Sequence, residues 1–223
     1  MRRRGTKLRR ILEKRRPGLA NLAGGLLSAA SGSEVQTLYV TSSRAGEGKT
    51  TVAALMAYGL SMIGNGGVAL VEANTGALAL QSFCEVEGEP PGFFDYLLSR
   101  VPLEQTISTP DPGGPAIIPA GTTAAIDAWM DAFDKAVFPQ KLRELQERFG
   151  YVVFDGDPVL PSPTSTLHAH LFDAVIVVVE CGRTKWEVAQ IACNKLNRSG
   201  GNILGVVLNK RKYPIPAGLY GRV

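Results

Sequence analysis

Residues 41–51 hold side chains and glycines whose order and spacing suit phosphate chemistry. The segment reads TSSRAGEGKTT, the GxxxxGK[ST] pattern with Ser43 in place of the first glycine. Glycines let backbone N–H groups turn toward an anion, and the lysine and threonine that close the pattern can contact phosphate and Mg²⁺. The residues predicted to contact the phosphates are Ser43, Arg44, Ala45, Gly46, Glu47, Gly48, Lys49, Thr50 and Thr51.

A phosphate-bound metal also needs a carboxylate, and Asp155 is the candidate. It ends the apolar run YVVFD, where the carboxylate can hold Mg²⁺ through water while Thr50 binds the metal directly. Asp157 stands two residues further on and could assist. The alternative for Asp155 is a turn former at a strand end, since Asp-Gly often serves that purpose.

The elements that must position these residues alternate regularly along the chain. Apolar runs predict strands at 37–40, 68–73, 116–121, 151–155, 173–179 and 203–209. Helices are predicted at 50–63, 138–149 and 184–198, with a turn and short helix in 88–98. Strands that alternate with helices in this way indicate an α/β fold with a doubly wound, mostly parallel sheet.

The net charge of +4 is an average over two unlike parts. Residues 1–17 carry nine basic residues and one acid, whereas the remainder has an excess of four acids. We therefore divide the chain into a basic N-terminal arm with a helix (1–34), a nucleotide-binding domain (35–212) and a C-terminal tail (213–223). The arm is an anion-binding feature separate from the phosphate loop.

The composition excludes several classes of protein. The chain is 45% hydrophobic, which excludes disorder, and its three widely spaced cysteines indicate neither a disulfide framework nor a zinc site. No run of about 18 apolar residues is present to span a membrane. The arm and the segment after it resemble a secretory or twin-arginine signal, but glycines and Asn21 dilute the apolar part, so we expect a cytoplasmic location.

Taken together, these segments resemble the cytoplasmic module of the bacterial tyrosine kinases (BY-kinases), in the wider group of partition and division-site ATPases. The resemblance covers roughly residues 36–212 and rests on TSSRAGEGKTT, VALVEANTG, PGFFDYL, IIPAG, YVVFDGDPVL, VVVECGRT and ILGVVLN, in the family's order. It implies a P-loop NTPase fold of the deviant Walker type that binds ATP or ADP with Mg²⁺. It also implies Lys49, Glu72 and Asp155 as catalytic residues, Thr50, Asp155 and Glu72 at the metal, and Asn209 at the adenine.

The departures from the family pattern concern the chemistry. The second acidic motif reads Glu72-Ala73-Asn74 instead of Asp-x-Asp, so the charge at Asn74 is lost. A family aspartate aligns with Thr164, and a family arginine aligns with Glu180. The tyrosine cluster of the tail is reduced to Tyr213 and Tyr220, and the family's arginine-rich oligomerisation helix is not recognisable, so a ring octamer is not expected. We therefore expect nucleotide binding with weak or lost tyrosine kinase activity.

The resemblance favours a MgATP-binding regulator of exopolysaccharide or capsule synthesis that is cytoplasmic and peripheral to the inner membrane. Its expected partner is an inner-membrane polysaccharide co-polymerase (chain-length determinant), with the arm on anionic lipid or an acidic protein surface. An active tyrosine autokinase and a scaffold with a vestigial site are alternatives. A further alternative is a partition-type ATPase dimer that binds DNA or membrane through the arm. In such a dimer Arg44 would reach a phosphate across the dimer; otherwise Arg44 is an exposed loop residue. The GEGK loop argues against this type, and thus against a nucleic-acid partner.

Overall fold

The computed structural model describes residues 21, 23–25, 28, 35–63, 66–76, 79–80, 86, 90–131 and 137–211. Most of the predicted arm and the whole of the tail, with Tyr213 and Tyr220, lie outside the described residues. Within the arm, Ala23 is buried and packs in the same apolar cluster as the helix that follows the phosphate loop. In the described part of the chain, no helix has both the length and the apolar character needed to cross a membrane.

The fold is built on a six-stranded sheet in the order β3-β2-β4-β1-β5-β6, and every described strand pair in it is parallel. The strands are β1 (Thr37–Ser42), β2 (Val68–Glu72), β3 (Ala116–Ile118), β4 (Tyr151–Asp155), β5 (Ala174–Glu180) and β6 (Ile203–Asn209). The predicted doubly wound α/β sheet is thereby confirmed. Apolar β-branched runs such as AVIVVV in β5 suit a sheet that is covered on both faces.

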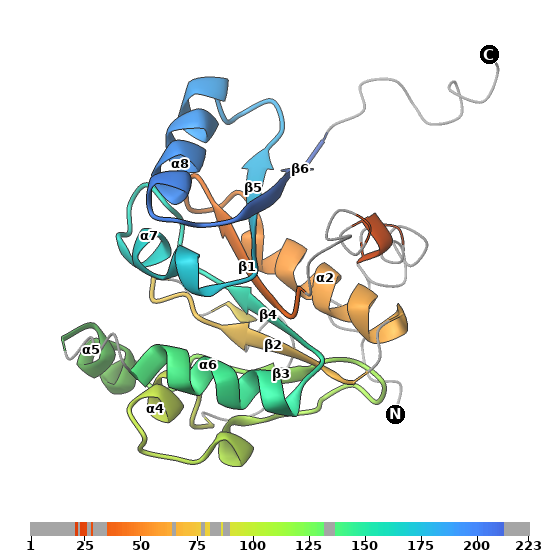
Figure 1. Ribbon diagram of the computed structural model, residues 1–223, viewed down its shortest axis with the longest axis vertical. Coiled ribbons are helices and arrows are strands. Elements are labelled where there is room, and N and C mark those ends of the chain that lie inside the picture. The colour runs from red at the N-terminus through yellow and green to blue at the C-terminus, as the bar shows by residue number, and fades with distance from the viewer. Residues whose placement is uncertain are drawn as a thin grey trace, which may run out of the picture.

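Helices cover both faces of the sheet and enclose two apolar cores (Figure 1). One face packs against α2, whose residues Val52, Met56 and Leu60 are buried. The other face packs against the remaining helices and carries an aromatic cluster that includes Phe93, Phe138, Phe154 and Phe172. The helical elements are α2 (Lys49–Ile63), α4 (Phe93–Leu97), η1 (Leu103–Thr106), α5 (Thr123–Asp131), α6 (Val137–Arg148), α7 (Thr164–His168), η2 (Ala169–Leu171) and α8 (Trp186–Arg198).

The third strand is shorter than predicted, and hydrogen bonds to α4 explain why. β3 ends at Ile118 instead of continuing to residue 121. The carbonyl oxygens of Pro119 and Ala120 accept hydrogen bonds from the N–H groups of Phe93 and Phe94 at 2.7 and 3.0 Å. The PGFFDYL and IIPAG segments, which are distant in sequence, therefore lie against each other.

The register of the sheet brings the ends of three strands to one level. β4 lies between β1 and β2, with Asp155 opposite Val40 on one side and opposite Glu72 on the other. Because carboxyl ends of parallel strands share one edge of a sheet, the phosphate loop after β1 and the acidic residues of β2 and β4 meet there. The elements thus position the residues that the sequence singled out.

Candidate nucleotide-binding site

The phosphate loop connects the end of β1 to the first turn of α2. Its glycines Gly46 and Gly48 have φ angles of 84° and 95°, in the left-handed region that favours glycine. Gly48 also packs tightly, since a Cβ atom there would lie 2.2 Å from Nδ2 of Asn209. The loop leads into a 15-residue helix whose N-terminus carries a partial positive charge. Loop and helix therefore have the geometry of an anion site.

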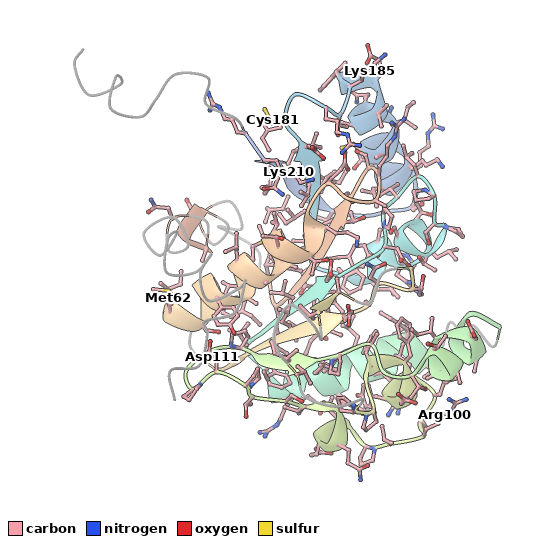
Figure 2. All side chains as sticks on the ribbon, turned by 180° about the vertical axis from the view of Figure 1, so that it is seen from behind. Met62, Arg100, Asp111, Cys181, Lys185 and Lys210 are labelled. Carbon is pink, nitrogen blue, oxygen red and sulfur yellow. The ribbon has the colours of Figure 1, made fainter. Side chains whose placement is uncertain are left out.

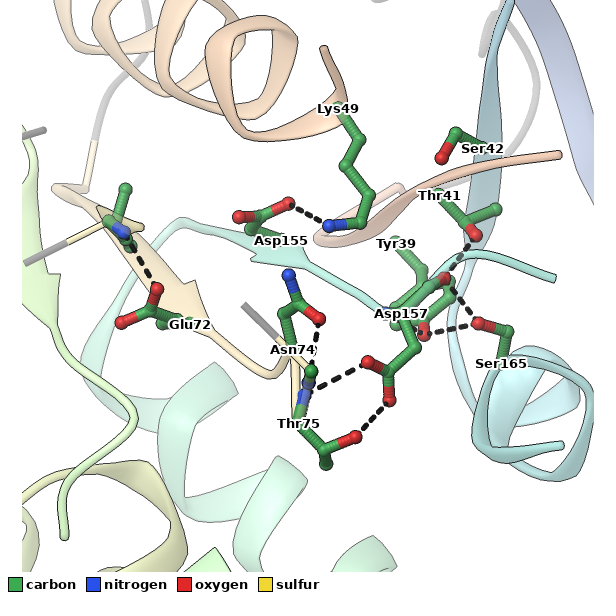
Figure 3. A network of polar contacts seen from close by, with 12 residues as sticks. Tyr39, Thr41, Ser42, Lys49, Glu72, Asn74, Thr75, Asp155, Asp157 and Ser165 are labelled. Atoms are coloured by element: carbon green, nitrogen blue, oxygen red, sulfur yellow. Dashed lines mark hydrogen bonds and ion pairs between the residues drawn. The ribbon is translucent and has the colours of Figure 1, made fainter. Parts of the chain in front are cut away.

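Lys49 and Asp155 form a buried pair at the centre of this edge (Figure 3). The Lys49 Nζ atom lies 3.8 Å from Oδ1 of Asp155, whose side chain is fully buried. Neither carboxylate oxygen accepts a hydrogen bond of normal geometry from the described residues, and the buried Ser43 hydroxyl has no such partner either. Burial raises the pKa of Asp155 to about 6, although the Lys49 ammonium and the Thr50 hydroxyl act to lower it. A buried carboxylate with unused hydrogen-bonding capacity fits the outer shell of a hydrated Mg²⁺ ion.

The side chain of Glu47 faces the protein. It is 3% exposed, its Oε2 accepts a hydrogen bond from the Arg44 backbone N–H at 2.9 Å, and its Oε1 accepts one from the Thr184 hydroxyl. The sequence predicted Glu47 as a nucleotide contact but did not single out Thr184, which is the last residue of the VVVECGRT segment. These contacts engage the carboxylate, so the role of Glu47 as a phosphate contact stays a prediction that concerns its backbone N–H. Arg44 is exposed on the same loop.

The carboxylate of Glu72 is held by backbone amides on the far side of β2. Its Oε1 accepts the N–H of Leu80 at 2.7 Å and its Oε2 accepts that of Ala120 at 3.3 Å. Figure 3 shows the side chain directed away from the Lys49–Asp155 pair. The structure therefore does not bring this carboxylate to the pair, and its metal role stays a prediction. The buried Asn74 comes two residues after Glu72, and the N–H of the intervening Ala73 donates to the carbonyl oxygen of Asp155 at 3.0 Å, so this segment adjoins the end of β4.

Asp157 ties the segment after β2 to α7. Its Oδ1 accepts the backbone N–H of Thr75 at 2.9 Å, and its Oδ2 accepts the hydroxyls of Thr75 at 2.9 Å and Thr164 at 2.5 Å. Thr164 is the position that aligns with a family aspartate, so a carboxylate from a neighbouring loop contacts that position here. The sequence could indicate the acid but not this network, because the partners of Asp157 come from two separate segments.

The turn after Asp155 is fixed through the backbone. The N–H of Asp157 donates to the hydroxyl of Tyr39 at 3.1 Å, and its carbonyl accepts the hydroxyls of Thr41, at 2.6 Å, and Ser165. Gly156 is required between them, since a Cβ atom there would lie 2.0 Å from the Tyr39 ring. These contacts hold the end of β4 rigidly beside the phosphate loop.

Sequence comparison finds relatives among bacterial tyrosine kinases, whereas no family model matches the chain. The tyrosine-protein kinase CpsD of Streptococcus agalactiae serotype III (strain NEM316) is 26% identical over 180 residues, which cover 81% of this chain and 76% of the relative. The tyrosine-protein kinase YwqD of Bacillus subtilis (strain 168) is 22% identical over 179 residues, covering 80% and 74%. These relatives confirm the resemblance that the motifs predicted.

Solved structures share the fold. The kinase domain of VpsO has a TM-score of 0.78 at 24% identity and covers 90% of this chain and 98% of its own. The chimerical protein CapA2B2 has a TM-score of 0.79 at 19% identity, covering 87% and 84%. A MinC:MinD cell division protein complex of Aquifex aeolicus gives 0.66 at 21% identity, covering 79% and 69%. The P-loop fold of tyrosine kinases and partition-type ATPases is thus confirmed.

We predict that Asp157→Asn lowers the free energy of unfolding by about 2–4 kcal/mol. Three donors converge on the carboxylate, and an amide would present its own NH₂ group to at least one of them. Urea denaturation of the variant and the wild type would measure the loss. Asp127→Asn, on the exposed side of α5, is the matched control and should stay within about 0.5 kcal/mol of the wild type. An Asp157→Asn variant as stable as this control would contradict the structural role of Asp157.

Proposed function

We propose that this chain binds ATP or ADP together with Mg²⁺ in the loop between β1 and α2. The observation that carries the proposal is the buried Asp155 carboxylate, which accepts no hydrogen bond of normal geometry from the described residues and faces Lys49 at the start of α2. Lys49 would balance phosphate charge, while Thr50 and Asp155 would hold the metal. When bound, Mg²⁺ neutralises charge on the phosphates. The loop N–H groups would bind the same phosphate oxygens.

Tyrosine kinase activity is weak or lost in this proposal. Phosphoryl transfer depends on positioned charges around the phosphates, and every 1.4 kcal/mol of lost stabilisation slows it about tenfold. Asn74 carries no charge in the segment that adjoins the end of β4, and the Glu72 carboxylate is held by the amides of Leu80 and Ala120. Asp155 therefore remains as the carboxylate that faces Lys49. Such a site supports binding better than transfer.

We further propose that the protein regulates exopolysaccharide or capsule synthesis from the cytoplasmic side of the inner membrane. The relatives are named tyrosine kinases, and the motif resemblance connects such modules with membrane polysaccharide co-polymerases. The basic residues of the arm would contribute about 1 kcal/mol each near anionic lipid, falling with salt. Self-association other than a ring is compatible with this proposal.

We predict that Lys49→Ala weakens MgATP and MgADP binding by at least about tenfold, because the variant loses the ammonium that faces the phosphates. Isothermal titration calorimetry with both nucleotides would measure the effect. Lys185→Ala removes an equal charge from an exposed position beyond β5 and should bind as the wild type does. If Lys49→Ala binds both nucleotides as tightly as the wild type, the assignment of the site is wrong. If the wild type binds neither nucleotide, the alternative of a scaffold with a vestigial site is favoured.

Restoring a charge at position 74 should restore catalysis. We predict that Asn74→Asp raises Mg²⁺-dependent ATP hydrolysis or tyrosine phosphorylation about tenfold, since it returns a carboxylate to the segment that adjoins the end of β4. Phosphate release and phosphotyrosine detection, with a Tyr213→Phe/Tyr220→Phe variant as the control for tail sites, would measure it. If the wild type already phosphorylates these tyrosines at a rate that Asn74→Asp does not increase, the chain is an ordinary autokinase and this account of its activity is wrong.

We predict that the arm binds anionic membranes by charge. A variant with the nine basic residues of positions 1–17 changed to glutamine keeps the buried Ala23 in place, so it is a sharper test than deletion of the arm. The wild type should co-sediment with vesicles that contain phosphatidylglycerol, and added salt or the glutamine variant should abolish this. Equal sedimentation of both proteins would discard the membrane role, while salt-dependent binding of the wild type to random duplex DNA alone would favour the partition-type alternative.

A further inference from the structure

The end of β6 contacts the phosphate loop, although more than 160 residues of chain separate the two segments. Nδ2 of Asn209, the last residue of β6, donates to the carbonyl oxygen of Glu47 at 2.9 Å. Nζ of Lys210, the next residue, donates to the carbonyl oxygen of Gly46 at 2.5 Å. Figure 2 shows Lys210 at this end of the molecule, close to Cys181. Two successive carbonyl groups of the loop are thus held by two successive residues.

Holding these carbonyls fixes the direction of the N–H groups that follow them. In a trans peptide the C=O and the N–H point to opposite sides of the peptide unit. The Gly46 carbonyl shares its peptide unit with the N–H of Glu47, and the Glu47 carbonyl shares its unit with the N–H of Gly48. With both carbonyls turned toward the end of β6, both N–H groups are turned away from it. A phosphate loop needs this arrangement, because its amides must converge on the anion.

The local geometry of both residues agrees with a positioning role. Lys210 has a φ angle of 56°, a left-handed conformation that costs a non-glycine residue on the order of 1 kcal/mol. Asn209 approaches Gly48 so closely that any Cβ atom there would collide with its amide. The backbone is thus bent and packed so that these two side chains reach the loop.

Glu180 completes the arrangement by fixing the Lys210 ammonium. Its Oε2 lies 3.0 Å from Nζ of Lys210 and 3.5 Å from the guanidinium of Arg183. Glu180 stands where the family pattern has an arginine, which would repel Lys210. The acid at this position therefore supplies the counter-ion for a lysine that contacts the phosphate loop.

We propose that Asn209 and Lys210 are positioning residues of the phosphate loop, which orient the N–H groups of Glu47 and Gly48 toward the phosphates. This inference rests on the proposed nucleotide binding and replaces the adenine contact expected of Asn209 with an effect on phosphate. It predicts that loss of either side chain weakens the binding of ligands with and without a base by about the same factor.

The test compares ATP with tripolyphosphate, which has the phosphates but no base. Asn209→Ala and Lys210→Met should each weaken the binding of both ligands by about the same factor, on the order of tenfold. Competition calorimetry against the wild type would measure the two factors. Loss of ATP affinity alone would assign Asn209 to the adenine and overturn the proposal, and unchanged affinity for both ligands would overturn it as well.

Two further variants separate positioning from general damage. Lys210→Arg can donate to the same carbonyl and pair with Glu180, so it should recover most of the affinity for both ligands. Lys195→Met removes an exposed charge from α8 and should bind as the wild type does. If Lys210→Arg binds as poorly as Lys210→Met while its urea midpoint equals that of the wild type, the proposal is wrong. A wild type that binds neither ligand would refute nucleotide binding itself, and the positioning role would fall with it.

Discussion

The parallel register of β1, β4 and β2 is the constraint on which the site depends. It places Asp155 level with Val40 and Glu72, so the loop after β1 must pass directly over the end of β4. A shift of one residue would turn the Asp155 side chain to the opposite face of the sheet and leave Lys49 without its partner. Apolar residues on both faces of β4 oppose such a shift, because each would have to exchange one core for the other. The packing of the core thus determines the electrostatics of the site.

The buried carboxylates at this edge of the sheet differ in the hydrogen bonds that they accept from the protein. Asp157 and Glu47 each accept hydrogen bonds from several protein donors, which compensates the cost of burial. Asp155 is as deeply buried and accepts no hydrogen bond of normal geometry from the described residues, although the Lys49 ammonium lies 3.8 Å from its Oδ1. A protein tolerates such a carboxylate at a cost, and the cost is recovered when a ligand supplies the missing partners. This contrast distinguishes Asp155, which is suited to bind a ligand, from Asp157 and Glu47, which hold the surrounding segments in place.

The sequence predicted the sheet and the phosphate loop because both signals are local. Continuous apolar runs indicate buried parallel strands, and GxxxxGK[ST] is a contiguous motif. The direction of the Glu72 carboxylate, the partners of Asp157 and the contact of Lys210 with Gly46 depend on which loops meet in three dimensions. Motif alignment assigns a role to a position but cannot show which atom a side chain reaches. The helix α5 was also missed, because its alanines and threonines give a weak apolar pattern.

The departures from the family pattern are physically connected. Position 74 lacks the charge of the family's second acidic motif, while Asp157 adds a charge two residues after Asp155. Asp157 contacts Thr164, whose family counterpart is an aspartate, so a carboxylate is present in this region and accepts hydrogen bonds from Thr75 and Thr164. Similarly, Glu180 stands in place of the family arginine and forms an ion pair with Lys210, which contacts the phosphate loop. In both cases the charged side chains hold the segments around the phosphate loop. Position 74, where a carboxylate would assist phosphoryl transfer, is uncharged. Under the proposed function, this distribution of charge suits a site that binds a nucleotide better than it turns one over.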